Sequence, residues 1–240
     1  AQSTNEIIWV RNTTEAINLV ANGLQFEKGQ EIITTNLEHH SGVLPFHKQV
    51  KLKGLTLRIV EASEEGIFDL ADFEETINKN TRLISIVHTS NVSGTTAPLE
   101  EIIKLAHDHG AFVLSDDAQS FPHKKLDVKK SSVDFSAVSM HKALGPTGVG
   151  FLYAKEHLLQ EMDSFLVGGD TIKDVKYEHG EIIPTYLDPP QKYEAGLQNY
   201  AGEIGAGAAV DYLNAIGMEN IEAREKALTV KLFDALSSLG

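Results

Sequence analysis

The fold is decided by residues 83–119, which read LISIVHTSNVSGTTAPLEEIIKLAHDHGAFVLSDDAQ. Two short segments rich in Val, Ile and Phe, LISIVH (83–88) and AFVLS (111–115), predict strands bounded by turn residues. Between them, LEEIIKLAHDHG (99–110) places Leu99, Ile102 and Ile103 near one helical face and stops at a glycine. A strand, a helix and a second strand in this order predict a βαβ unit with parallel strands.

The same alternation continues along the chain in both directions. Strands are predicted at 6–10, 31–35, 55–61, 83–88, 111–115, 135–139 and 149–154. Helices are predicted at 14–24, 41–54, 69–79, 99–110, 200–217 and 218–239. We therefore expect an α/β fold: a three-layer αβα sandwich around a mainly parallel seven-stranded sheet. The polar, proline-containing segment 173–192 predicts a long irregular excursion.

Composition narrows the class of protein. The chain has 240 residues, 42% hydrophobic, with a formal net charge of −13 and no cysteine. An acidic protein lacks the basic surface that nucleic acids and anionic membranes require, so we expect neither partner. No apolar segment approaches the roughly 18 residues of a membrane span, and the expectation is a cytoplasmic protein. Without cysteine there is no disulfide framework and no thiolate metal site.

Polar side chains follow several predicted strands, where open α/β sheets bind their ligands. After the first strand, Thr13 and Thr14 stand at the start of a helix. Threonine hydroxyls beside free helical N–H groups suit a phosphate. A plain helix cap supplied by Asn12 or Thr13 explains the same residues.

Further strand ends carry a histidine and an asparagine. His39 can stack on a planar ligand or move protons near neutral pH, or it is an ordinary loop histidine. Neighbours with zinc-ligand spacing are missing around it, so we expect no metal. Asn91 could donate to a ligand or simply form a turn. His107 and His109 lie two apart at a helix end and are interpreted as surface residues.

The strands at 111–115 and 135–139 are followed by ionisable side chains that are common in binding and catalytic sites. Asp116 and Asp117, with Gln119 close behind, suit a metal, a cationic ring nitrogen or an Asx turn. SMHKALGPTGVG (139–150) follows the next strand. If this stretch is extended, Ser139 and His141 point to one side and Lys142 to the other. Its lysine precedes the glycines, whereas a P-loop lysine follows them.

One small ligand fits all of these strand ends. Pyridoxal 5′-phosphate needs a lysine amine for its aldehyde, a carboxylate for its pyridine nitrogen, and hydroxyls with a helix start for its phosphate. Lys142, Asp116 and the threonines at 13 and 14 provide these groups. Each signal alone is weak, and the hypothesis depends on their occurring together.

Five motifs in this order resemble a known family: EHHS (38–41), HTSNVSGT (88–95), SDDAQSFPH (115–123), SMHKALGPTGVG (139–150) and YEAGLQN (193–199). They are similar to the cysteine desulfurase and selenocysteine lyase group of the class-V aminotransferases, which are fold-type-I pyridoxal-phosphate enzymes. The resemblance runs from about residue 7 to the end. It implies the large cofactor-binding domain of that fold.

The resemblance also implies residue roles. Lys142 would be the Schiff-base lysine, and His39 would stack on the cofactor ring and assist proton transfer. Asp116 would pair with the pyridinium nitrogen, while Asn91 and Gln119 would contact the side of the ring that carries the hydroxyl. The phosphate would be held by four side chains: Thr13, Thr14, Ser139 and His141.

Three positions depart from the family pattern. Asp117 and Met140 stand where the family usually has glycine, beside cofactor contacts. Leu197 replaces the threonine that reaches the partner subunit's phosphate in the family, and a leucine cannot make that bond.

The implied activity is removal of sulfur from L-cysteine, giving alanine and an enzyme-bound persulfide for iron–sulfur cluster assembly. That reaction needs a cysteine nucleophile, and the chain has none. In the family, this cysteine and the arginine that binds the substrate carboxylate lie in a C-terminal domain. We therefore expect residues 1–240 to be part of a longer protein with a further N-terminal segment and a small C-terminal domain.

The resemblance further implies a homodimer and a sulfur-accepting protein. Alternatives are selenocysteine lyase, C–S lyase, aminotransferase or epimerase chemistry.

Overall fold

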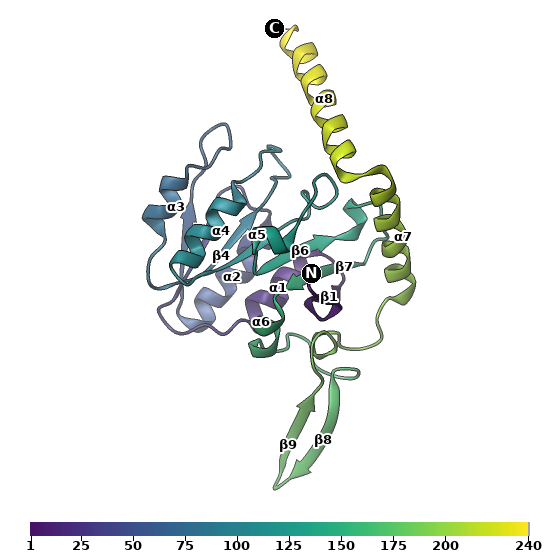
Figure 1. Cartoon of the computed structure of the whole chain (residues 1–240). Coiled ribbons are helices and arrows are strands. Elements are labelled where there is room, and N and C mark those ends of the chain that lie inside the picture. The colour runs from purple at the N-terminus through teal and green to yellow at the C-terminus, as the bar shows by residue number, and fades with distance from the viewer. Residues whose placement is uncertain (240) are drawn as a thin grey trace.

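The computed structural model describes residues 1–239 and contains the predicted seven-stranded sheet (Figure 1). Its strands are β1 (Ile7–Val10), β2 (Glu31–Thr35), β3 (Thr56–Val60), β4 (Thr81–Val87), β5 (Phe112–Asp116), β6 (Phe135–Ser139) and β7 (Gly150–Ala154). The spatial order is β1-β7-β6-β5-β4-β2-β3. β7 is antiparallel to both of its neighbours, and the pairings from β6 to β3 are all parallel. β1 and β6, both antiparallel to β7, therefore run in the same direction.

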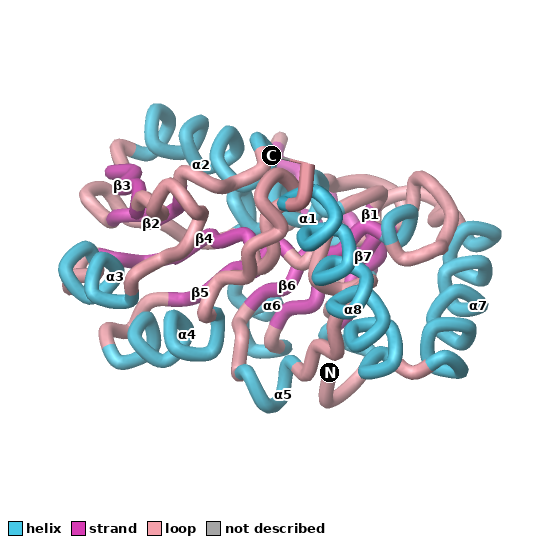
Figure 2. The backbone as a smooth tube through the Cα atoms, turned by 90° about the horizontal axis from the view of Figure 1, so that it is seen from above, coloured by secondary structure: helices cyan, strands magenta, loops and turns pink. Residues whose placement is uncertain are grey.

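Helices cover both faces of this sheet, which confirms the three-layer prediction (Figure 2). One face carries α1 (Thr13–Gly23) and α2 (His40–Lys53); the other carries α3 (Leu70–Thr76), α4 (Leu99–Asp108) and α5 (Val128–Ser131). The remaining helices are α6 (Glu156–Glu161), α7 (Tyr200–Ile216) and α8 (Met218–Ser237). The sequence did not predict α5 and α6, which have four and six residues and are too short to show a helical period.

Alternation along the central strands divides the core into two layers. Ile32 and Leu114 pack in the cluster under α1 and α2, whereas their neighbours Ile33 and Val113 pack in the cluster under α3 and α4. All four side chains are fully buried. Side chains of this size contribute about 2 kcal/mol each when buried. Because both faces are covered, the central strands β2, β4, β5 and β6 are buried at nearly every position, as parallel strands in α/β folds usually are.

The segment predicted to be irregular contains a β-hairpin, so that prediction was wrong. β8 (Ile172–Glu178) and β9 (Glu181–Tyr186) pair antiparallel and project from the body (Figure 1). The turn residues His179 and Gly180 both have positive φ, as a type I′ hairpin turn requires. Every residue of β9, and all but the first of β8, is exposed. Because both strands are exposed, neither needs the alternation of apolar and polar residues from which a strand is predicted.

Helix α8 also extends away from the sheet and buries none of its side chains (Figure 1). Within residues 1–239, none of the helices combines the length and apolar character needed to cross a membrane.

His107 lies at the surface with 32% of its side chain exposed, but it also contacts a buried carboxylate that the sequence did not predict. Its Nε2 lies 2.8 Å from Oδ2 of the buried Asp134, which also accepts the backbone N–H of Val113 at 2.8 Å. Oδ1 of Asp134 accepts from Lys155 Nζ at 2.6 Å. The carboxylate thus joins α4, the start of β5 and the residue after the end of β7, at the edge of the sheet opposite the strand ends that carry the motifs.

Gly150 allows β7 to pass close to the start of α1. A Cβ at this position would lie 2.8 Å from the Cα of Asn12 and would collide with the carbonyl oxygen of Val138. We expect Gly150→Ala to lower the free energy of unfolding by about 2 kcal/mol, because the overpacked backbone must shift. Urea denaturation of the intact protein measures this. Gly207→Ala is the matched control: its added methyl meets open space within α7, and an unchanged Gly150→Ala midpoint would contradict the close approach.

Candidate cofactor site

All nine side chains singled out from the sequence line one cavity of about 190 Å³. They are Thr13, Thr14, His39, Asn91, Asp116, Gln119, Ser139, His141 and Lys142. Five strands that run in the same direction, β1, β2, β4, β5 and β6, bring them together, because each residue lies at or just after a carboxyl end. Asn12, Ser41, Val87 and Ala118 complete the lining. The structure establishes their proximity, and their individual roles remain predictions.

The buried end of the cavity contains a carboxylate. Asp116 ends β5, is 5% exposed, and accepts the backbone N–H of Ala118 through Oδ1 at 3.0 Å. This bond is the Asx turn considered from the sequence, and the same side chain still lines the cavity. Burial raises the pKa of Asp116 to about 6, reinforced by the charge of Asp117 and opposed by that of Lys142. A cationic nitrogen placed here would therefore meet a carboxylate with high proton affinity.

The start of α1 is fixed against the end of β6. Asn12 caps the helix by accepting the backbone N–H of Glu15 at 3.0 Å. The Thr13 backbone N–H donates to Ser139 Oγ at 2.8 Å, and the two hydroxyls lie 2.8 Å apart. Asn12 supplies the helix cap, so Thr13 and Thr14 remain free to line the cavity. The sequence interpretations of a helix cap and of an anion site are therefore both compatible with the structure.

A chain of hydrogen bonds orients His39 at the more exposed rim. Thr14 Oγ1 lies 2.7 Å from Ser41 Oγ, which lies 3.0 Å from His39 Nδ1. The Ser41 backbone N–H also donates to that nitrogen at 3.2 Å, so Nδ1 is an acceptor and neutral His39 carries its proton on Nε2. Partial burial lowers the pKa of His39, as do the charges of Lys142 and His40, which favours the neutral ring at pH 7.

Lys142 reaches the cavity by a route that the sequence did not predict. β6 ends at Ser139 and the chain turns into a 3₁₀ helix, Met140–Lys142, instead of continuing extended. The extended backbone assumed for residues 139–142 was wrong, so strand periodicity does not decide where these side chains point. In the turn, all three side chains line the same cavity.

Sequence reasoning missed the buried carboxyl group of Glu38. Its Oε1 accepts from Thr35 Oγ1 at 2.7 Å and from the Val87 backbone N–H at 2.8 Å, which ties the end of β2 to the end of β4. Its Oε2 is buried and unpaired among the described residues. Burial raises the pKa of Glu38 to about 8, opposed by these two hydrogen bonds and assisted by the charge of Asp116. The EHHS motif contains Glu38, but its burial could be predicted only by knowing that Val87, far away in the sequence, contacts it.

The two family departures beside the cavity point away from it. Asp117 lines a separate cavity of about 780 Å³, while its neighbour Asp116 lines the cofactor-sized one. Met140 is 1% exposed and packs in an apolar cluster with Val149 and Leu213. Neither side chain narrows the cavity that holds Lys142.

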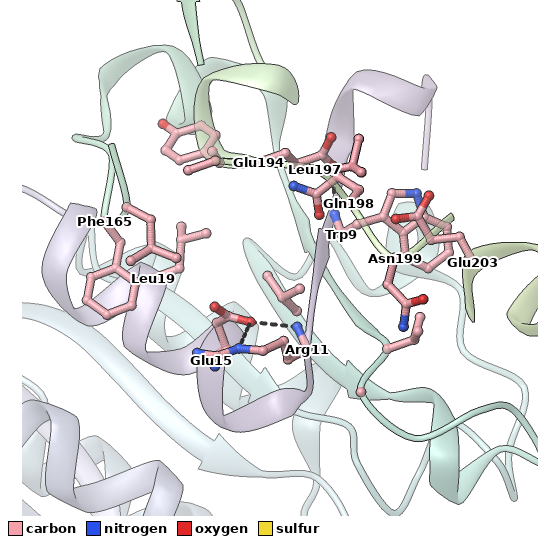
Figure 3. Close-up of a pocket in the computed structure, with 16 residues that line it drawn as sticks. Trp9, Arg11, Glu15, Leu19, Phe165, Glu194, Leu197, Gln198, Asn199 and Glu203 are labelled. Atoms are coloured by element: carbon pink, nitrogen blue, oxygen red, sulfur yellow. Dashed lines mark hydrogen bonds and ion pairs between the residues drawn. The ribbon is translucent and has the colours of Figure 1, made fainter. Parts of the chain in front are cut away.

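Leu197, the third departure, lies in another cavity of about 430 Å³ (Figure 3). Segment 193–199 borders this cavity together with Trp9, Phe165 and the Arg11–Glu15 ion pair. None of the nine predicted site residues lines it. The Leu197 side chain is 82% exposed, so it presents an apolar surface where the family pattern has a hydroxyl.

Comparisons with known proteins agree with this geometry. The model of the aminotransferase class-V family matches residues 1–240. A probable cysteine desulfurase of Methanothermobacter thermautotrophicus is 41% identical over 99% of this chain and 58% of its own length. The cysteine desulfurase structure from Thermococcus onnurineus superposes with a TM-score of 0.94 at 39% identity, covering 99% of this chain and 59% of that one.

A third relative is a C-DES variant with glycine covalently linked to its pyridoxal-phosphate cofactor. It superposes with a TM-score of 0.82 at 27% identity and covers 92% of this chain and 59% of its own. The chain belongs to the class-V aminotransferase family, and within it is similar to cysteine desulfurases. It spans a little under three-fifths of the length of these relatives.

The buried Glu38 generates a prediction about stability. Its folded pKa lies above the unfolded value, so folding becomes less favourable as pH rises from about 4.5 to about 8. Glu38→Gln keeps an acceptor for Thr35 and Val87 but cannot ionise. We expect the variant to gain about 4 kcal/mol relative to the parent between pH 5 and pH 9. Urea denaturation across this range measures the difference, and parallel pH profiles would contradict it.

Proposed function

We propose that residues 1–240 are the cofactor-binding part of a longer pyridoxal-phosphate-dependent cysteine desulfurase. The observation that carries this is the convergence of Lys142, Asp116 and the Thr13–Ser139 hydroxyl pair on one cavity. The family match and the desulfurase relatives support it. The covalent cofactor in the C-DES relative supports the choice of pyridoxal phosphate.

The residues present fit this cofactor. A phosphate dianion suits the start of α1, where hydroxyls and the helix dipole favour negative charge. A ring nitrogen suits Asp116, the buried carboxyl with raised proton affinity. An aldehyde needs a reachable amine, and Lys142 is exposed to the cavity instead of buried in the core.

When bound, the cofactor supplies an electron-withdrawing ring that stabilises negative charge at the substrate's α-carbon. Lys142 would hold the cofactor aldehyde, and its amine would move the proton at the substrate's α-carbon. Asp116 would keep the ring nitrogen protonated. His39 would lie against the ring, and its Nε2 proton is free because Nδ1 accepts the backbone N–H of Ser41.

The remaining lining residues orient the cofactor. Asn91 and Gln119 would contact the side of the ring that carries the hydroxyl. Four side chains would hold the phosphate: Thr13, Thr14, Ser139 and His141. Because Thr13 and Ser139 already bond to each other at 2.8 Å, the phosphate site is preorganised before the ligand arrives.

The sulfur-accepting cysteine lies outside this chain, which has none. In the proposed reaction that cysteine attacks the sulfur of L-cysteine, the C–S bond breaks, and a proton completes alanine while the enzyme keeps a persulfide. Selenocysteine is the alternative substrate. We further propose a cytoplasmic homodimer that passes sulfur to an acceptor protein for iron–sulfur cluster assembly.

The reaction type is tested by incubating the intact protein with L-cysteine and a thiol reductant. Equal amounts of alanine and sulfide support the proposal. Pyruvate with ammonia instead would identify β-elimination, and no reaction of L-cysteine with a ready reaction of L-selenocysteine would identify a selenocysteine lyase. Both of these outcomes would contradict desulfurase activity.

The cofactor role of Lys142 is tested by its optical signature. We expect the intact protein with pyridoxal phosphate to develop a yellow absorption band that borohydride bleaches, and Lys142→Ala to lack this band. Lys130→Ala is the matched control, since Lys130 is an exposed lysine paired with Glu100 on the opposite side of the sheet. An equal band in both variants would show that the cofactor reacts with another amine.

A further inference from the structure

Asp117 is a completely buried carboxylate held by three donors. His88 Nδ1 lies 2.7 Å from its Oδ1, and Ser120 Oγ donates to the same oxygen at 2.9 Å. Ser136 Oγ donates to Oδ2. The backbone of Asp117 is also paired, with its N–H donating to the Ala137 carbonyl at 3.0 Å. β4, β5 and β6 therefore meet at this one side chain, directly after the Asp116 that lines the cofactor cavity.

This set of contacts favours a negative charge on Asp117. An ionised carboxylate only accepts hydrogen bonds, whereas a protonated one must give up an acceptor site to its own proton. Two serine hydroxyls and a histidine nitrogen all direct hydrogen bonds at it. Burial raises the pKa of Asp117, but the bonds from His88, Ser136 and Ser120 more than offset this and lower it overall.

The charge is isolated from the cavity by the backbone. On its own side, Asp117 and His88 line a cavity whose rim carries Glu100, Glu101, Lys124, Lys125, Asp127, Lys130 and Glu222. Four acidic and three basic groups on this rim largely cancel. On the other side, Asp116 lines the cofactor cavity with His39 and Lys142, and its charge also acts on the buried Glu38. Asp117 is thus the buried anion adjacent in the chain to Asp116, at a position where the similar family usually has glycine.

We propose that Asp117 is a positioning residue that acts through Asp116: its buried charge strengthens the hold of the Asp116 carboxyl on a proton at the floor of the cofactor cavity. The effect on the cofactor rests on the proposed function, because in that function Asp116 shares its proton with the cofactor ring nitrogen. A second negative charge nearby favours any positive charge at that site. This chain would therefore keep the ring protonated to higher pH than a glycine at 117 allows.

The experiment measures the titration of Asp116 directly by ¹³C NMR of carboxyl-labelled aspartate in the cofactor-free intact protein, with Asp116→Asn to assign the signal. We expect Asp117→Gly and Asp117→Asn each to lower the titration midpoint of Asp116 by about one pH unit. Asp117→Gly removes the charge without burying an amide, so the test does not depend on one variant folding. An unmoved Asp116 signal in either folded variant would overturn the proposal.

Asp134→Asn is the matched control. Asp134 is also a buried aspartate paired with a histidine, His107, but it lies at the opposite edge of the sheet. We expect this variant to lose stability and leave the Asp116 midpoint unchanged. A shift as large as that of Asp117→Gly would show that loosening of the sheet, and not charge, moves Asp116.

The consequence for the cofactor is read by ¹⁵N NMR of protein loaded with ring-labelled pyridoxal phosphate. The ring nitrogen should lose its proton at lower pH in Asp117→Gly than in the parent, and equal titrations would overturn the link to the cofactor. A parent protein that binds no pyridoxal phosphate would refute the proposed function alone, because the cofactor-free titration still decides the effect of Asp117 on Asp116.

Discussion

The site depends on the common direction of five strands. β1, β2, β4, β5 and β6 all end at one edge of the sheet, so residues more than a hundred positions apart line one cavity. Thr13 and Ser139 show the result most clearly: they are separated by 126 positions and joined at 2.8 Å. In the seven-stranded sheet, β7 runs antiparallel to both of its neighbours, β1 and β6. β1 therefore runs in the same direction as β6 and ends at the same edge of the sheet.

Charge is distributed within that edge by burial. Three carboxyl groups lie near this edge of the sheet, those of Glu38, Asp116 and Asp117, and their different surroundings give them different pKa values. Burial without enough donors keeps Glu38 largely protonated near pH 7, whereas donors from three sides keep Asp117 ionised. Asp116, with a pKa of about 6, lies between them and faces the cavity. Neighbouring carboxyl groups with such different pKa values are typical of sites that hold or move protons.

Much of the fold and the lining of the site could be predicted because both follow from local patterns. Apolar runs located seven strands, and the polar residues after them located nine lining side chains. The errors have two causes, which are contacts with distant parts of the chain and local turns without a clear sequence signal. His107 contacts Asp134, which lies 27 positions away in the sequence, and Lys142 lines the cavity after the chain turns at Ser139. Glu38 and the exposed β8–β9 hairpin likewise lack a local signature.

The central claim is that these strand ends form a pyridoxal-phosphate site with Lys142 as its covalent anchor. The most direct measurement is to load the intact protein with the cofactor, reduce it with borohydride, digest it and locate the modified lysine by mass spectrometry. The account predicts one phosphopyridoxyl group, on the peptide that contains Lys142. Modification spread over surface lysines, or confined to a peptide without Lys142, would contradict it.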